Sequence, residues 1–221
     1  MNRRRAATSA GISVLLVDDH PVVRDGYRRM LENTPEIRVI AEAGDGETAC
    51  AAYAELKPDV VILDLTMPGI GGLETIRRLT AVDPSARILA FTMHDSETMI
   101  RRTLEAGAVG YLTKASGMGQ MVEAVRTVAQ WKPYIDPTHV TAVARSVISG
   151  VSAGPLQILS AREFQLFQRF ADGQSAAEIA AALRISPKTV GVHHANIMRK
   201  LDLQNAAQLV RLAIRCNVVA P

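Results

Sequence analysis

The sequence is poor in cysteine, in aromatic residues and in long hydrophobic runs. Its two cysteines, Cys50 and Cys216, are too far apart for a metal-binding or redox motif. This scarcity predicts a reduced, cytoplasmic protein. Aromatic residues make up only 4% of the chain, which argues against a protein that binds single-stranded nucleic acid by base stacking.

No apolar run approaches the roughly 18–20 residues that a transmembrane helix requires. The first ten residues contain basic side chains, but no apolar segment follows them, so they do not form a secretory signal. We therefore expect no membrane partner.

Charge is unevenly distributed along the chain. The net charge is +3, but residues 1–132 carry 16 basic and 17 acidic side chains, whereas residues 133–221 carry 9 basic and 5 acidic ones. A basic C-terminal part behind an acidic N-terminal part indicates nucleic-acid binding by the C-terminal part. The same modest excess of positive charge is also compatible with an ordinary solvated surface.

The N-terminal part alternates apolar, β-branched runs with helical patterns. The runs predict five strands, over 12–17, 37–41, 59–63, 87–92 and 109–112, with five helices between and after them. The run 59–63 is apolar on both faces, which is typical of a central parallel strand. This alternation predicts an α/β doubly wound five-stranded parallel sheet. The glycine-rich stretch 68–72 predicts a turn before a helix.

Polar side chains follow four of these strands. In a doubly wound sheet the carboxyl ends of the strands form the ligand-binding edge. The side chains at that edge are Asp18, Asp19, Asp64, Thr92 and Lys114. Each has an ordinary explanation alone, such as a helix cap for Asp19 or a solvated turn for Lys114. Their occurrence together at one edge favours a site.

The chemistry of these side chains indicates phosphoryl transfer. Carboxylates that lie close together repel one another unless a cation sits among them, and Mg²⁺ prefers such oxygen ligands. A lysine and a threonine hydroxyl suit phosphoryl oxygens. An aspartate carboxylate can itself accept a phosphoryl group. The sequence therefore predicts an aspartyl-phosphate site with Mg²⁺.

Four segments of the N-terminal part resemble the receiver domain of bacterial two-component response regulators, which is flavodoxin-like. They are VLLVDDHPVVRDG (14–26), VVILDLTMPGIGGLE (60–74), ILAFTMHD (88–95) and GAVGYLTKAS (107–116). The resemblance implies that a sensor histidine kinase phosphorylates Asp64. It implies that Asp18, Asp19, Asp64 and the backbone carbonyl of Thr66 hold Mg²⁺. It also implies that Thr92 and Tyr111 are the switch pair and that Lys114 contacts the phosphoryl oxygens.

The C-terminal part predicts a small all-α domain behind a linker. We expect a receiver over 12–131, a linker over 132–156 with a short helix within 139–148, and a second domain over 157–221. Ser160 and Glu163 form a capping box, and Ser175 and Ser186 cap the next two helices. A short turn at 184–185 separates those two helices and predicts a helix-turn-helix. The alternative is a purely structural four-helix bundle.

The segments LSAREFQLF, GQSAAEIAAAL and ISPKTVGVHHANIMRKL (159–167, 173–183 and 185–201) look like the LuxR-type helix-turn-helix. Together with the receiver, they make the chain similar to the NarL/FixJ class. The resemblance implies that 186–200 is the recognition helix. Its candidate contacts to double-stranded promoter DNA are Lys188, Thr189, His193, Asn196 and Lys200, with His193 more a structural or phosphate-facing residue than a base reader.

Two residues of the expected recognition helix depart from the common pattern of this class. Gly191 and His194 stand where a larger or basic residue, often arginine, is frequent. A glycine inside a helix costs about 0.5–1 kcal/mol relative to alanine. Fewer basic side chains also release fewer counterions on DNA binding, which lowers affinity.

These features predict a phosphorylation-dependent transcription regulator and not an enzyme. We expect it to bind DNA as a homodimer through the helix after Gln204, so a charge at Leu209 or Ile214 should weaken DNA binding. A phosphatase-type enzyme is the first alternative, but Thr66 occupies the place where many such enzymes carry a general-acid aspartate. The second alternative is a receiver that acts mainly through protein contacts, with weak DNA binding.

Overall fold

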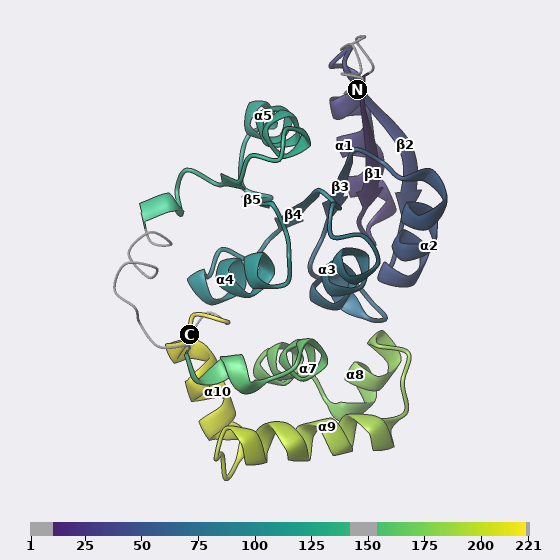
Figure 1. The fold of residues 1–221 in the computed structure, drawn as a ribbon. Coiled ribbons are helices and arrows are strands. Elements are labelled where there is room, and N and C mark those ends of the chain that lie inside the picture. Colours follow the sequence, from purple (N-terminus) through teal and green to yellow (C-terminus); the bar gives the residue numbers. More distant parts are fainter. Residues whose placement is uncertain (1–10, 142–153, 220–221) are drawn as a thin grey trace, which may run out of the picture.

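A parallel sheet of six strands organises the N-terminal part of the molecule (Figure 1). The computed structural model describes residues 11–141 and 154–219. The strand order is β2-β1-β3-β4-β5-β6, and every neighbouring pair is parallel. The strands are β1 (Ile12–Val17), β2 (Ile37–Ala43), β3 (Val60–Leu63), β4 (Ile88–Thr92), β5 (Gly110–Thr113) and β6 (Tyr134–Ile135).

The sixth strand corrects the sequence prediction, which gave five. β6 pairs with β5 through Gly110 with Tyr134 and Tyr111 with Ile135. Between α5 (Met118–Ala129) and β6, Trp131 adopts a left-handed conformation with φ of 62°. A strand of two residues is too short to show an alternating pattern, and β6 lies in the stretch 132–156 that we expected to be linker.

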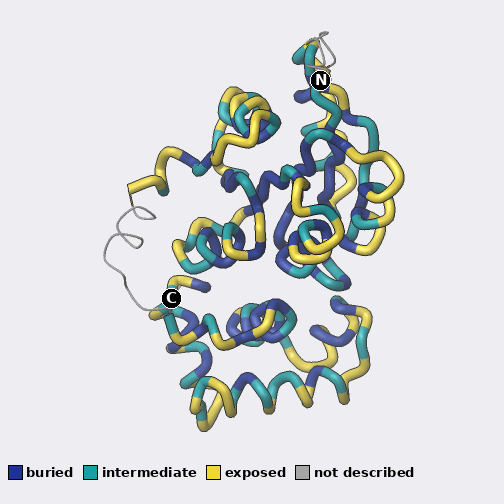
Figure 2. The backbone as a smooth tube through the Cα atoms, viewed as in Figure 1, coloured by how far each residue is buried: buried dark blue, intermediate teal, exposed yellow. Residues whose placement is uncertain are grey.

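Helices cover both faces of the sheet, as the prediction of a doubly wound fold requires. α1 (Pro21–Glu32) and α5 (Met118–Ala129) cover one face, and α2 (Gly46–Leu56), α3 (Gly71–Val82) and α4 (Glu97–Glu105) cover the other. Alternate residues of β1 enter the two cores: Val14 and Leu16 pack on the α1–α5 side, Leu15 and Val17 on the α2–α3–α4 side. The central strands are accordingly buried (Figure 2).

The C-terminal part is helical. It contains the 3₁₀ helix η1 (Pro155–Ile158) and the helices α7 (Ala161–Ala171), α8 (Ala176–Ala182), α9 (Pro187–Lys200) and α10 (Ala206–Arg215). The predicted caps are confirmed, because the side chains of Ser160, Ser175 and Ser186 each accept a hydrogen bond from a backbone N–H in the first turn. The helix expected within 139–148 lies largely outside the described residues.

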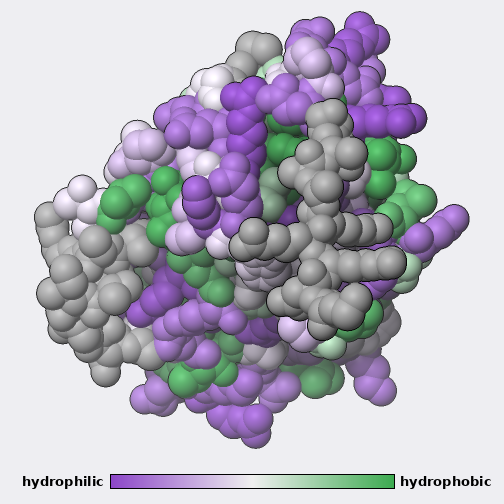
Figure 3. All heavy atoms as spheres, turned by 45° about the horizontal axis from the view of Figure 1, so that its top comes forward, coloured by the Kyte–Doolittle hydropathy of each residue, from purple (hydrophilic) through white to green (hydrophobic). Residues whose placement is uncertain are grey.

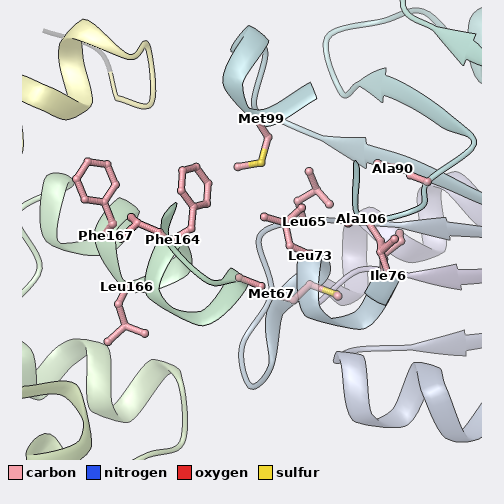
Figure 4. Close-up of a cluster of buried hydrophobic side chains, with 14 of the residues drawn as sticks. Leu65, Met67, Leu73, Ile76, Ala90, Met99, Ala106, Phe164, Leu166 and Phe167 are labelled. Carbon is pink, nitrogen blue, oxygen red and sulfur yellow. The ribbon is translucent and has the colours of Figure 1, made fainter. Parts of the chain in front are cut away.

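The two parts share one hydrophobic core. α7 lies between α9 and the helices α3 and α4 of the first part (Figure 1). Phe164 of α7 belongs to the same buried cluster as Leu65, Met67 and Met99 (Figure 4). Arg102 of α4 is 4% exposed, donates 2.8 Å hydrogen bonds to the carbonyls of Leu156 and Leu159, and lies over the Phe164 ring. The helical part therefore docks on the α3–α4 side of the sheet.

The surface shows mainly hydrophilic side chains with separate, small apolar patches on the face seen in Figure 3. Among the helices of residues 11–141 and 154–219, we find none with the length and apolar character needed to cross a membrane.

Candidate functional site

Three strand ends bring Asp18, Asp64 and Lys114 into one buried pocket. Asp18 directly follows β1, Asp64 follows β3 and Lys114 follows β5. The Lys114 Nζ atom lies 2.6 Å from Asp18 Oδ2 and 2.6 Å from Asp64 Oδ2. Both carboxylates are buried, and Asp64 is only 4% exposed. The predicted lysine and two of the predicted aspartates are thus brought together.

α3 begins close to the backbone of Asp64. A Cβ atom on Gly72 would lie 2.5 Å from the Asp64 carbonyl oxygen, so only glycine fits there. Residues 68–70 form the turn that the sequence predicts, and residues 71 and 72 already begin α3. The Thr66 backbone N–H donates a 3.0 Å hydrogen bond to Asp64 Oδ1, which fixes the carboxylate from the opposite side to Lys114.

Burial and hydrogen bonding have opposing effects on the pKa of both Asp64 and Lys114. Burial raises the pKa of Asp64, although the hydrogen bonds from Lys114 and the Thr66 backbone act in the opposite direction. Burial also lowers the pKa of Lys114, but the hydrogen bonds with Asp18 and Asp64 outweigh it, so the pKa of this ammonium group is raised. Lys114 therefore keeps its positive charge between the two carboxylates at neutral pH.

Asp18, Asp19 and His20 form the one possible metal-binding cluster found in the described part of the chain. One Asp19 oxygen is buried and lacks a hydrogen-bond partner, although the His20 Nδ1 atom lies 2.9 Å from it. A buried oxygen that accepts no hydrogen bond is suited to bind a cation. The cluster adjoins Asp64 through Asp18, and carboxylate oxygens are the ligands that Mg²⁺ prefers. The donor set at this edge therefore fits a divalent cation.

Thr92 and Tyr111 lie behind the pocket, both fully buried. The Tyr111 hydroxyl donates a 2.8 Å hydrogen bond to the His94 carbonyl, and burial raises the pKa of this phenol. The Thr92 hydroxyl accepts from the His94 backbone N–H at 3.4 Å. The His94 ring in turn lies 3.0 Å from the Thr66 hydroxyl. The backbone of one residue thus joins both predicted switch residues.

The predicted recognition helix is α9, and it lies on the far side of α7 from the sheet (Figure 1). Val190 and Ile197 are buried and fix the inner face of the helix. Lys188 is exposed, and Thr189, His193 and Asn196 are half-buried along the side of the helix. The outward position of α9 leaves it accessible to a large partner.

Lys200 has a structural role that the sequence did not indicate. Its Nζ atom lies 2.6 Å from Oε2 of the buried Glu163, the residue that completes the capping box of α7. The pairing depends on the burial of Glu163, which only the fold reveals, because a buried carboxylate requires a cation. Among the predicted DNA contacts, Lys200 is the one whose charge is already paired within the described structure.

The exposed face of α9 includes residues that sequence reasoning missed. Besides Lys188 and Gly191, it presents Val192, Ala195 and Arg199 to solvent, and Val192 is 55% exposed. Spacings of three and four residues place these side chains on one side of a helix, so the pattern could have identified them. The face combines a small apolar centre with a cation near each end.

The two departures from the common LuxR pattern occupy different environments. A Cβ atom on Gly191 would meet nothing within 4 Å, so this position faces open space. The His194 ring instead packs against Phe170 of α7, with the ring centroids 4.6 Å apart. Gly191 therefore alters the outer surface of α9, whereas His194 belongs to the packing between α9 and α7.

The expectation for Leu209 is wrong. Leu209 is 1% exposed and lies in the core of the helical part, so a charge there would disrupt folding. A dimer contact needs exposed side chains, and apolar spacing alone did not separate core from surface on α10. Ile214 is half-buried and borders a surface groove with Leu203 and Arg211.

Comparisons with known proteins agree with this architecture. Residues 14–126 match the response regulator receiver domain, and residues 157–213 match the LuxR family of bacterial regulatory proteins. The response regulator GacA of Pseudomonas viridiflava is 39% identical over 209 residues, covering 94% of this chain and 98% of its own. The response regulator UvrY of Escherichia coli K12 is 38% identical over 210 residues, covering 93% and 96%.

Solved structures share this architecture over most of the chain or over part of it. RcsB from Salmonella enterica serovar Typhimurium, bound to promoter P1flhDC in the presence of the phosphomimetic BeF₃⁻, is 26% identical, with a TM-score of 0.65 over 91% of this chain and 98% of its own. A LuxR-family response regulator from Aurantimonas sp. SI85-9A1 is 40% identical, with a TM-score of 0.60 over 62% and 99%. The chain belongs to the NarL/FixJ class of two-component response regulators, which join a receiver to a LuxR-type DNA-binding domain.

Proposed function

We propose that phosphorylation of Asp64 by a sensor histidine kinase controls sequence-specific DNA binding by α9, and through it transcription, in the cytoplasm. The observation that carries this proposal is the pocket in which Lys114 contacts Asp18 and Asp64, each at 2.6 Å. A buried carboxylate beside a fixed cation is suited to accept a phosphoryl group and to hold its negative charge.

The transfer itself is a displacement at phosphorus. One Asp64 carboxylate oxygen forms a bond to phosphorus while the bond between phosphorus and the donor atom breaks, and the donor leaves with that electron pair. With the kinase, the donor atom is a histidine nitrogen; with a small acyl phosphate, it is a carboxylate oxygen. Lys114 keeps its proton and turns from the two carboxylates to the phosphoryl oxygens.

The residues that would hold Mg²⁺ are Asp18, Asp19, Asp64 and the backbone carbonyl of Thr66. The ion would neutralise the charge on the phosphoryl oxygens. The buried Asp19 oxygen, which accepts no hydrogen bond and lies 2.9 Å from the His20 Nδ1 atom, supports this assignment. Lys114 contacts two of the same carboxylates, so it balances their charge from the other side of the pocket.

The proposed switch runs from Thr92 and Tyr111 to the docked helical domain. Both side chains bond to the backbone of His94, and His94 lines a small cavity with Gln168 of α7 and with Asp172, which follows that helix. A movement of Thr92 toward a phosphoryl group would disturb this junction. We propose that the helical domain is released or realigned as a result.

For DNA recognition we propose Lys188, Thr189, His193 and Asn196 as contacts, with Lys200 acting mainly through Glu163. A homodimer would double these contacts, and the exposed side of α10 around Ile214 is the proposed interface. The promoter-bound RcsB structures support the DNA-binding part of the proposal by similarity.

The test is selection of bound fragments from genomic DNA, with and without Mg²⁺ and a small acyl phosphate, for the wild-type chain and Asp64→Asn. We expect a shared inverted-repeat site that is enriched only for the wild type with the donor. Equal enrichment in all samples would retain DNA binding and remove the Asp64 switch. No enrichment under any condition would favour a receiver that acts through protein contacts.

A further inference from the structure

Asp136 is a buried carboxylate directly after β6, outside the pocket described above. It is 1% exposed and has no lysine or arginine among its hydrogen-bond partners in the described chain. Its charge is balanced instead by hydroxyl and backbone donors. Burial raises the pKa of Asp136, but the hydrogen bonds from Ser116, Thr138 and Thr113 lower it well below its usual range. The side chain is therefore an anion held by hydrogen bonds alone.

Two of those donors flank Lys114 in the loop after β5. The Thr113 hydroxyl donates to Asp136 Oδ2 at 2.8 Å, and the Ser116 hydroxyl donates to the same oxygen. The Lys114 backbone N–H donates to the Thr92 carbonyl at 2.8 Å. The short segment that presents the Lys114 ammonium is thus anchored by Asp136 on one side and by β4 on the other.

The other carboxylate oxygen and the backbone of Asp136 extend the network. Oδ1 accepts from the Thr138 hydroxyl at 2.7 Å and from its backbone N–H at 3.1 Å. The Asp136 backbone N–H donates to the Tyr111 carbonyl at 2.9 Å, which continues the pairing of β6 with β5. One residue therefore contacts the Lys114 loop, the strand that carries Tyr111 and the chain that leads into the linker.

We propose that Asp136 is a positioning residue for phosphorylation: it holds the loop from Thr113 to Ser116 so that the Lys114 ammonium meets Asp64. The inference rests on the proposed phosphoacceptor role of Asp64. It explains why a two-residue strand follows α5, since β6 delivers the anchoring carboxylate to the loop. It also makes Trp131, the single tryptophan of the chain and three residues before β6, a reporter for this segment.

If Asp136 served stability alone, its loss would lower the Tm no differently from the loss of a comparable carboxylate elsewhere. A matched variant at Asp83 distinguishes a stability role from a positioning role. Asp83 is a carboxylate that accepts from Ser85 and Tyr53, with its pKa lowered to about 2, and it lies beyond the end of α3, remote from the pocket. Asp83→Ala should lower the Tm without changing the reaction at Asp64. Asp136→Ala should lower both the Tm and the rate of phosphorylation of Asp64.

The experiment measures phosphorylation of the full chain by a small acyl phosphate with Mg²⁺, followed by intact-protein mass spectrometry. For Asp136→Ala we expect a rate about tenfold below the wild type, because loosened positioning of a reacting group costs at least that much. Asp136→Asn keeps one acceptor oxygen and should recover part of the rate. Equal phosphorylation rates for the wild type and Asp136→Ala would overturn the proposal. A loss of rate in Asp83→Ala as large as that in Asp136→Ala would also overturn it.

A second variant covers the case in which Asp136→Ala does not fold. Thr113→Val with Ser116→Ala removes the two hydroxyl donors of the loop and leaves the carboxylate in place, and the rate should fall in the same direction. Unchanged phosphorylation of this double variant would also overturn the proposal. Failure of the proposed function has a separate signature, namely a wild-type chain that gains no phosphoryl group or an Asp64→Asn variant that still gains one.

Trp131 gives a readout that does not depend on the rate. Phosphorylation should shift its fluorescence in the wild type, because a displaced Lys114 disturbs the anchored loop and β6. In Asp136→Ala that shift should disappear even after the donor concentration is raised until the variant is phosphorylated. A shift of the same size in phosphorylated Asp136→Ala would count against the anchor.

Discussion

The proposed phosphoacceptor pocket and the outer face of α9 use charge in opposite ways. In the pocket, Asp18 and Asp64 are buried, and the half-buried Lys114 bonds to each of them at 2.6 Å. On α9, Lys188 and Arg199 are exposed at either end of a small, neutral centre. The charges of the pocket are already paired with one another by the strand ends, whereas the charges on the outer face of α9 are open to solvent, where we propose that DNA binds.

This difference decides what a substitution does in each region. Removing one member of a buried charged group leaves the others without compensation, so the effect is large and concerns both chemistry and stability. Adding or removing a charge on an exposed helix face changes binding through counterion release and leaves folding almost unaffected. Four predictions test this contrast, beginning with the largest expected effect.

Lys114→Gln should lower the rate of phosphorylation by about 10²–10³, the cost of losing one preorganised charged donor. The variant also leaves Asp18 and Asp64 facing each other without a cation, which raises the pKa of Asp64 further. Phosphorylation by a small acyl phosphate measures the loss. Lys132→Gln, an exposed lysine beyond α5, is the control and should react like the wild type.

Arg102→Ala should loosen the contact between the two domains by about 2–5 kcal/mol, because the carbonyls of Leu156 and Leu159 lose a buried charged donor. Differential scanning calorimetry should then show two unfolding transitions where the wild type shows one. Arg78→Ala, which removes an exposed arginine paired with Glu74 on α3, should leave the transition intact. A single unchanged transition for Arg102→Ala would show that apolar packing alone holds the domains.

Lys200→Met should destabilise the helical domain by about 1–3 kcal/mol, since Glu163 would lose its cation. Burial raises the pKa of Glu163, but the hydrogen bonds from Lys200 and Ser160 have the larger effect. The pKa therefore lies below the ordinary 4.5. This stabilisation is therefore present above pH 4.5 and lost as the pH falls through the lowered pKa. Thermal unfolding at several pH values tests both statements, and the gap between the wild type and the variant should close in acid.

Gly191→Arg and His194→Arg should differ although both add a cation to α9. An arginine at position 191 enters open space, so the slope of log affinity against log salt should steepen by about one. An arginine at position 194 replaces the ring that packs on Phe170, which should cost about 0.5–1.5 kcal/mol of stability and leave the slope nearly unchanged. Equal salt slopes for the two variants would contradict the assignment of inner and outer faces.

The sequence was most informative where chemistry is tied to strand ends. The alternation of runs places Asp18, Asp64, Thr92 and Lys114 at one edge, because the carboxyl ends of parallel strands must meet there. The helix caps at Ser160, Ser175 and Ser186 were equally predictable, since each depends on neighbours within one turn. These features need only local spacing and the direction of the strands.

The sequence was less informative where a residue depends on distant partners. Lys200 resembles a DNA contact until Glu163 is placed beside it, and Leu209 resembles an interface residue until the packing of α10 on α7 is known. β6 was missed because two residues carry no periodic pattern. In each case the deciding contact joins segments whose pairing only the assembled fold supplies.

The core shared by the two domains has a consequence for the newly made chain. Met99 is synthesised 65 residues before Phe164, the aromatic residue that closes the cluster around it. At roughly 5–20 residues per second, about 3–13 s pass between the synthesis of Met99 and that of Phe164, and until α7 folds this apolar surface has no cover. The nascent chain therefore passes through a stage in which this exposed apolar surface can attract chaperones or neighbouring chains. That stage ends when α7 emerges and folds onto α3 and α4.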